Sequence, residues 1–244
     1  MSFQWNGEFN ICGMERSGST FVWQVLKELG CNATKSHSYK MGNTQAVKFY
    51  TYRDPRDVIC SYARTVLVPE INSGEIHDTY HPDGSVERVH DAARRIAAYR
   101  LFYRPNARQL DYRCYMWEAN QGAPIAFLKY EDYFGGNEEK LVEDICSFVS
   151  MFQPLVYDEN LIKMIAKKYS REKNHERALK FDTFAEYDEE TGIHGDHITH
   201  GGSTWRDDFS FDVAVAVDRF LGDFLIELGY ETDQSWFEQF AENS

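Results

Sequence analysis

The sequence predicts an α/β protein of three layers, in which helices flank a central, mostly parallel sheet. Short apolar segments alternate along the chain with longer segments of helical spacing, an order typical of a parallel sheet covered on both faces. Apolar residues make up 43% and charged residues 27% of the 244 residues, as in ordinary globular proteins. This length suits a single α/β domain, and we expect residues 1–244 to form one.

The first elements are expected to be a strand, a tight loop, a helix and a second strand. Residues 9–14 are a short apolar run, and glycine and small hydroxyl residues follow it. Helical spacing of apolar residues covers 21–29 and stops at Gly30. Residues 46–52 form an alternating strand, and a helix over 54–64 begins at Asp54-Pro55, a capping residue before a proline.

The rest of the chain continues the alternation of helices with one further strand. Apolar spacing predicts helices over 85–104, 107–119, 138–152, 158–169 and 210–228, and a strand over 123–128. Two segments rich in turn-forming residues, 68–84 and 171–204, are expected to be irregular.

Charge and cysteine usage exclude several classes of protein. The formal net charge of −13 repels a phosphate backbone, so we expect no nucleic-acid partner. The five cysteines include no CxxC pair, which favours a reducing compartment over a disulfide framework. We expect no membrane segment, because no run approaches 18 apolar residues and the N-terminus has no leader pattern. A cytoplasmic location is the expectation that follows.

Residues 13–20 (GMERSGST) match part of the nucleotide P-loop, G-x4-G-K-[ST]. Their place between a predicted strand and helix is the right context, so the fold is expected to be of the P-loop type. Small residues there let the backbone wrap around an anion, and amide groups at the helix N-terminus point toward it. The alternative is a plain strand-to-helix turn.

The P-loop lysine is absent, because Ser19 occupies its position. In an ATPase that lysine reaches the β- and γ-phosphates. The cation of this loop is Arg16, and no strand ends in a clear magnesium-binding aspartate. The loop is therefore expected to hold a 5'-anion that has no γ-phosphate, without a metal.

A second anion site is predicted around residues 52–64. Arg53 ends a strand, and Ser61 follows it by eight residues, early in the next helix. Ligands of open α/β sheets bind at the carboxyl ends of the strands. Two anion sites on neighbouring loops suit a nucleotide phosphorylated at two places. Surface ion pairing of Arg53 and Arg56 with Asp54 and Asp57 is the alternative.

The pair GMERSGSTF and YRDPRDVICSYAR closely resembles the sulfotransferase family. The segment 128–132 (LKYED) resembles the family's Y-E-D segment, and 200–209 (HGGSTWRDDF) resembles its late G-x-x-x-W-[KR]-x-x-F loop. The resemblance runs from about residue 9 to 210 and implies a single sulfotransferase-like domain. It also implies 3'-phosphoadenosine 5'-phosphosulfate (PAPS) as donor, adenosine 3',5'-bisphosphate as product, and no metal.

The resemblance assigns roles to residues that match the family's motifs. Arg16 is implied to be catalytic and to bind the donor together with the other residues of its loop. The remaining implied donor contacts are Ser17, Gly18, Ser19, Thr20, Phe21, Arg53, Ser61, Tyr130 and Gly201. Phe21 and Tyr130 are implied at the adenine, with core packing as the alternative. Where the family's late loop often has R-K-G, this chain has Ile198, Thr199 and His200.

A base is needed to take the proton of the acceptor, and histidine suits this role near neutral pH. Lys35-Ser36-His37 resembles the family's K-[ST]-H segment, which implies His37 as the base and Lys35 beside the sulfuryl group. The alternatives left open are Glu15, His77 and His81. The spacing of His194, His197 and His200 raises zinc as a further alternative, although the segment has no cysteine and no clear fourth ligand.

The expected function is metal-independent, in-line transfer of a sulfuryl group from PAPS to a hydroxyl or similar group of a small-molecule or glycan acceptor. The rival interpretations are a P-loop small-molecule or nucleoside kinase, which needs ATP and Mg²⁺, and a non-catalytic nucleotide-binding module. The sequence indicates neither the acceptor's identity nor the oligomeric state.

Overall fold

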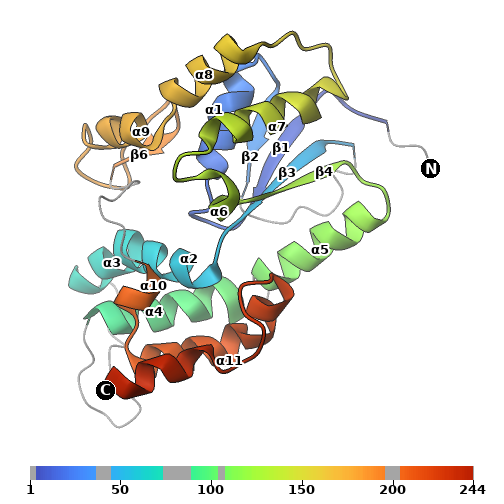
Figure 1. Ribbon diagram of the computed structural model, residues 1–244. Coiled ribbons are helices and arrows are strands. Elements are labelled where there is room, and N and C mark those ends of the chain that lie inside the picture. The colour runs from blue at the N-terminus through green and yellow to red at the C-terminus, as the bar shows by residue number, and fades with distance from the viewer. Residues whose placement is uncertain (1–3, 37–44, 74–88, 104–107, 196–203, 244) are drawn as a thin grey trace. The chain divides into compact units, whose positions relative to one another are not determined.

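The structure is a computed structural model, and it describes residues 4–36, 45–73, 89–103, 108–195 and 204–243 (Figure 1). The chain divides into two compact units. Unit 1 comprises Met1–Arg53 and Asp111–Thr199, and unit 2 comprises Asp54–Leu110 and His200–Ser244. A single domain over the whole chain stays a prediction.

Unit 1 is built on a four-stranded sheet whose neighbouring strands are all parallel. Its strands, in spatial order, are β2 (Ala33–Lys35), β1 (Phe9–Gly13), β3 (Val47–Tyr52) and β4 (Ile125–Lys129). The sheet and its flanking helices confirm the predicted fold class. The short strand β2 was not predicted.

One face of this sheet carries the apolar core of unit 1. Along β3, Val47 and Phe49 point to the same side because successive strand residues alternate between faces. Helices on this side contribute Val25, Ile145 and Ile165, all of which are fully buried. These helices are α1 (Ser19–Glu28), α7 (Glu138–Ser150) and α8 (Glu159–Lys168) (Figure 1).

The other face of the sheet packs on α5 (Arg108–Asn120). Tyr50, from the alternate side of β3, contacts Tyr115 with ring centroids 5.0 Å apart. Lys48 is only 5% exposed, forms an ion pair with Glu118, and lies 5.6 Å from the centre of the Tyr115 ring. A buried charge is costly unless it is paired, so the carboxylate of Glu118 offsets the cost of burying the Lys48 ammonium beneath the sheet.

The predicted irregularity of residues 171–204 is wrong for its first part. The described residues there form helix α9 (Arg171–Ala178) and the antiparallel pair β5 (Tyr187–Asp188) and β6 (Ile193–His194). A buried amide pair explains why so polar a segment is ordered. Asn174 and Gln24 exchange side-chain hydrogen bonds of 3.0 and 3.2 Å, which attach α9 to α1.

Unit 2 is helical in the residues that the structure describes. Its elements are α2 (Pro55–Tyr62), the π-helical turn η1 (Ala63–Leu67), α3 (Val68–Asn72), α4 (Val89–Ala98), the π-helical turn η2 (Tyr99–Tyr103), α10 (Trp205–Asp208), α11 (Phe211–Glu227) and the 3-10 helix η3 (Trp236–Asn243). The start of the predicted 68–84 loop is therefore helical. None of the helices described in either unit is long and apolar enough to cross a membrane.

Candidate functional site

The predicted anion loop joins β1 to α1, and the sheet closes tightly around it. Gly13 has a φ of 126°, and a Cβ placed there would lie 2.0 Å from the Thr51 carbonyl oxygen of β3. Gly18 has a φ of 88° and precedes the first residue of α1. A Cβ there would lie 2.5 Å from the ring of Phe134. Both positions require glycine, for the close approach as well as for the backbone angle.

Arg16, between these glycines, has a φ of 61° and is the one residue other than glycine with a positive φ in the described parts of the chain. Such a conformation is costly for a long side chain and is concentrated at functional sites. The loop thus holds its one arginine in a sparsely populated backbone state. The binding role of Arg16 stays a prediction.

The side chain of Ser17 forms hydrogen bonds within the loop and to β3. Its hydroxyl is buried, donates to the Met14 carbonyl oxygen at 2.6 Å and lies 2.7 Å from the Thr51 hydroxyl. The side chain of Ser17 is therefore engaged within the protein, and its predicted contact with PAPS stays a prediction. Ser19 and Thr20 begin α1 and are 5% and 6% exposed.

Lys35 joins this loop from the neighbouring strand β2. Its Nζ donates to the Thr20 hydroxyl at 2.9 Å, although much of the residue is exposed. Burial of the ammonium, and then the positive charge of Arg16, lower the pKa of Lys35 to about 8. Two cations therefore share the start of α1, where the helix dipole also favours negative charge. The roles predicted for Arg16 and Lys35 at the sulfuryl donor stay predictions.

The carboxyl ends of β3 and β4 carry a second group of predicted residues. The guanidinium of Arg53 lies 4.4 Å from the centre of the Tyr130 ring. Tyr130 in turn stacks on Phe134, with ring centroids 4.3 Å apart and an interplanar angle of 16°. Phe134 also meets the edge of Phe21 at 5.5 Å. Arg53, Tyr130, Phe134 and Phe21 thus form a continuous aromatic and cationic layer that reaches Gly18.

Phe134 was missed by the sequence analysis, and it changes the interpretation of Phe21. Phe21 is 4% exposed and belongs to the apolar core of unit 1, which is the packing role left open for it. Tyr130 is half-buried. The sequence carries no periodic signal for Phe134, because it follows the single helical turn α6 (Tyr130–Tyr133) as an extended C-cap.

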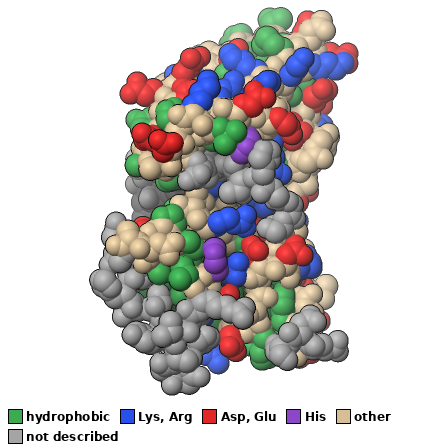
Figure 2. All heavy atoms as spheres, turned by 90° about the vertical axis from the view of Figure 1, so that its left-hand side faces the viewer, with side chains coloured by type: hydrophobic (Ala, Val, Ile, Leu, Met, Phe, Trp, Pro, Cys, Tyr) green, Lys and Arg blue, Asp and Glu red, His purple; other side chains and the backbone are tan. Residues whose placement is uncertain are grey.

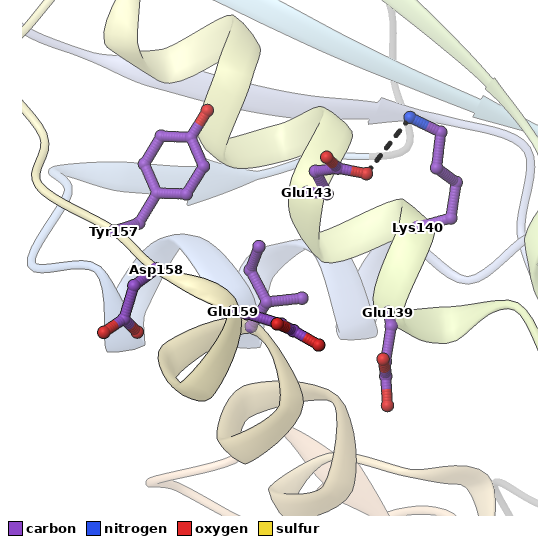
Figure 3. A pocket seen from close by; sticks show the side chains of 7 residues that line it. Glu139, Lys140, Glu143, Tyr157, Asp158 and Glu159 are labelled. Atoms are coloured by element: carbon purple, nitrogen blue, oxygen red, sulfur yellow. Dashed lines mark hydrogen bonds and ion pairs between the residues drawn. The ribbon is translucent and has the colours of Figure 1, made fainter.

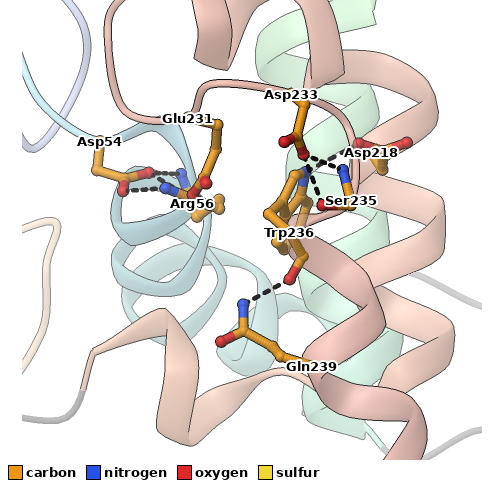
Figure 4. Close-up of polar contacts among 8 residues, drawn as sticks. All are labelled: Asp54, Arg56, Asp218, Glu231, Asp233, Ser235, Trp236 and Gln239. Atoms are coloured by element: carbon orange, nitrogen blue, oxygen red, sulfur yellow. Dashed lines mark hydrogen bonds and ion pairs between the residues drawn. The ribbon is translucent and has the colours of Figure 1, made fainter.

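Unit 2 contains Ser61 and Arg56, two further residues that the sequence singled out. Ser61 lies in α2, and its carbonyl oxygen accepts a hydrogen bond from Thr65. Arg56 pairs with Asp54, as in the alternative interpretation, but the pair is buried and not at the surface. Its side chain is 1% exposed, pairs with Asp54 at 2.8 Å and contacts Glu231 (Figure 4).

Two indole rings cover the Arg56 guanidinium, Trp205 at 3.8 Å and Trp236 at 4.9 Å. The backbone amide of Trp205 also donates to Asp57 at 3.0 Å. The segments after Arg53 and around Trp205, both singled out in the sequence, are therefore joined within unit 2 by a buried cluster. The positions of His37, His77, His81, His197, His200 and Gly201 lie outside the described residues.

A hollow of about 390 Å³ lies between α7 and α8 (Figure 3). Its lining is mostly acidic and consists of Glu139, Lys140, Glu143, Tyr157, Asp158, Glu159 and Ile162. Lys140 pairs with Asp144 at 2.6 Å and with Glu143 at 3.3 Å. Carboxylates repel a phosphorylated ligand, so this hollow does not suit the predicted donor.

The surface drawn in Figure 2 carries acidic and basic side chains interspersed. In the part of the chain that the structure describes, no group of three or more histidine, cysteine, aspartate or glutamate side chains is arranged to hold a metal ion.

Comparisons with known proteins agree with this architecture. No protein-family model matches the sequence, and a search of curated proteins finds no match. Among solved structures, retinol dehydratase in complex with androsterone and inactive cofactor PAP has a TM-score of 0.62 at 14% identity, covering 92% of this chain and 82% of that chain. The same enzyme with retinol and PAP has a TM-score of 0.58 at 14% identity, covering 92% and 82%.

A mouse sulfotransferase, SULT7A1, in complex with PAP has a TM-score of 0.60 at 13% identity, covering 99% of this chain and 91% of that chain. The similarity spans nearly the whole chain, although the sequences have diverged widely. The chain has the fold of the PAP-bound sulfotransferases.

Proposed function

We propose that this protein is a PAPS-dependent sulfotransferase. The observation that carries the proposal is the pairing of Arg16 and Lys35 at the glycine-bounded loop, where Ser19 replaces the P-loop lysine. Two cations and the N-terminus of α1 suit the 5'-phosphosulfate of the donor. The shared fold with structures that contain PAP supports the same donor.

The proposed reaction is an in-line displacement at sulfur. The acceptor oxygen forms a bond to sulfur, and the bond from sulfur to the bridging phosphate oxygen breaks, leaving the electron pair on adenosine 3',5'-bisphosphate. Arg16 and Lys35 stabilise the charge that develops on that oxygen. Arg16 stays charged throughout, and Lys35 is charged below about pH 8.

His37 is the proposed base. Ser36, the residue before it, is held on β1 by a hydrogen bond of 2.8 Å from its backbone amide to the Ile11 carbonyl oxygen. Lys35 and Ser36, the two residues before this histidine in the sequence, are therefore held beside β1. Arg53 and Ser61 are the proposed contacts of the 3'-phosphate, as their motif spacing implies, and Tyr130 is the proposed adenine contact.

The acceptor is proposed to be a hydroxyl-bearing small molecule or glycan. The neighbouring retinol dehydratase structures contain androsterone or retinol, both of which are alcohols. A screen for sulfated product can therefore begin with apolar alcohols and phenols, in the presence of PAPS.

Ligand-linked thermal stabilisation tests the donor. PAPS or PAP should raise the melting temperature of the wild-type protein, and ATP with Mg²⁺ should not, because a ligand stabilises only the fold that binds it. Turnover should also persist in EDTA. Lys163→Met is the control variant, because it removes an exposed lysine of α8 that is paired with Glu159. PAP should raise its melting temperature as much as that of the wild-type protein. Stabilisation by ATP and Mg²⁺ alone would favour the kinase interpretation instead.

A further inference from the structure

Two features of Arg16 bear on the position of its guanidinium. Its side chain is long and flexible, and the charge of Lys35 lies close enough to interact with it. Repulsion between two cations drives flexible side chains apart, most strongly where water is excluded. A guanidinium that must meet a leaving phosphate oxygen needs a surface that holds it in place.

Phe184 provides that surface. The guanidinium carbon of Arg16 lies 5.9 Å from the centre of the Phe184 ring, within the range of a cation–π contact. Phe184 is half-buried and is not among the residues of the apolar core of unit 1. Its ring therefore contributes little to that core, and it contacts Arg16 instead.

His194 holds Phe184 in this position. The two rings stack with centroids 4.7 Å apart and an interplanar angle of 16°. The Nδ1 of His194 also donates to the Phe184 carbonyl oxygen, 2.8 Å away. On β5, Tyr187 is paired across the two strands with His194 and stacks on it at 5.0 Å. Arg16, Phe184, His194 and Tyr187 form a continuous column, here called the ring column.

The hairpin that carries the ring column is fixed to α1, the helix that begins at the anion loop. Gln24 of α1 donates to the Thr191 carbonyl oxygen at 2.8 Å. A Cβ at Gly192 would lie 3.4 Å from the ring of Trp23, so the hairpin backbone packs directly on the helix. Ile193 is 1% exposed and anchors β6. The hairpin therefore has a fixed position relative to the loop.

We propose that Phe184, supported by His194, is a positioning residue that holds the Arg16 guanidinium at the anion loop for transfer of the sulfuryl group. The inference rests on the proposed function and adds Phe184, a residue that no sequence motif marked. Phe184 acts through Arg16, so its loss should have the same consequences as a misplaced Arg16.

Phe184→Ala should lower the single-turnover rate and the affinity for PAP by roughly three- to tenfold, the range of one partly desolvated cation–π contact. Phe184→Tyr keeps the ring and should restore both. Leu179→Ala is the matched control, because Leu179 lies nearby in the sequence and is 71% exposed. A Phe184→Ala protein with wild-type rate and affinity overturns the proposal.

A double-variant comparison separates positioning from general stability. In an Arg16→Ala background, Phe184→Ala should have no further effect, because the group that it positions is gone. An equal loss in both backgrounds would show that the ring acts elsewhere and overturns the proposal.

The Arg16 Nε–H resonance gives a readout that needs no nucleotide. It is identified by its absence from Arg16→Lys, and it should shift in Phe184→Ala and return in Phe184→Tyr. An unshifted resonance refutes the contact itself. Failure of the wild-type protein to bind PAP would instead refute the proposed function, and this resonance would still test the ring column.

Discussion

Arg56→Ala should destabilise unit 2 more than any exposed substitution in it. The variant removes the cation that Asp54 and Glu231 share and the group that lies between Trp205 and Trp236. The arginine is 1% exposed, so water cannot replace its contacts without rearrangement. The perturbation therefore leaves two carboxylates facing a cavity.

The magnitude follows from these contacts. Breaking one partner out of a buried ion pair costs about 3–5 kcal/mol, and desolvated ring contacts add about 1–2 kcal/mol. We expect a loss of about 4–7 kcal/mol, which is close to the whole stability of a marginal protein. Arg56→Lys should recover only part of it, because an ammonium cannot make the paired contacts of Nε and Nη2 with Asp54 at 3.0 and 2.8 Å.

Urea unfolding followed by circular dichroism and tryptophan fluorescence measures this loss. Arg206→Ala is the matched control, because Arg206 also lies over Trp205, at 4.2 Å, but is exposed. Its loss should cost less than about 1 kcal/mol. Equal free energies of unfolding for Arg56→Ala and Arg206→Ala would refute the reasoning, since burial would then make no difference.

The remaining predictions concern the anion loop. Gly18→Ala should weaken PAP binding, since the new methyl group displaces the Phe134 ring 2.5 Å away, and calorimetry measures the change. The affinity for PAP should fall as the pH rises above about 8, by at most about tenfold per unit, because binding must then return a proton to Lys35. Lys35→Arg should remove that dependence. Arg53→Ala should weaken PAPS by about 1.5–3 kcal/mol and spare adenosine 5'-phosphosulfate, which lacks the 3'-phosphate.

Each of these has an outcome that contradicts it. Unchanged PAP affinity in Gly18→Ala would mean that the loop tolerates a side chain. An affinity that is flat from pH 7 to 10 would remove Lys35 from the anion site. Equal losses for both nucleotides would make Arg53 a structural residue through its contact with Tyr130.

The sheet was predictable because its strands carry their own signals. Residues 46–52 alternate, and in the structure Phe49 enters the core of unit 1 while Tyr50 faces α5. The loop was predictable because Gly13 and Gly18 occupy positions where only glycine fits. The short strand β2 spans three residues, too few for a periodic pattern to emerge.

The ring column could not be predicted, because its order depends on contacts far apart in the sequence. Gln24 contacts Asn174 across 150 residues, and this contact orders a segment whose composition is typical of a loop. The internal use of the Ser17 hydroxyl was equally hidden, since it depends on Thr51 of another strand. Local patterns contain no information on such pairings.

The buried ion pair of Lys48 and Glu118 restricts which substitutions homologous sequences can carry at these two positions. A shift of α5 along the sheet by one turn would separate the two charges and leave both in an apolar setting. The ion pair therefore favours one alignment of α5 along the sheet over alignments shifted by a turn. Relatives of this chain should either keep both charges or replace both with apolar side chains, and a sequence with only one of them should be rare.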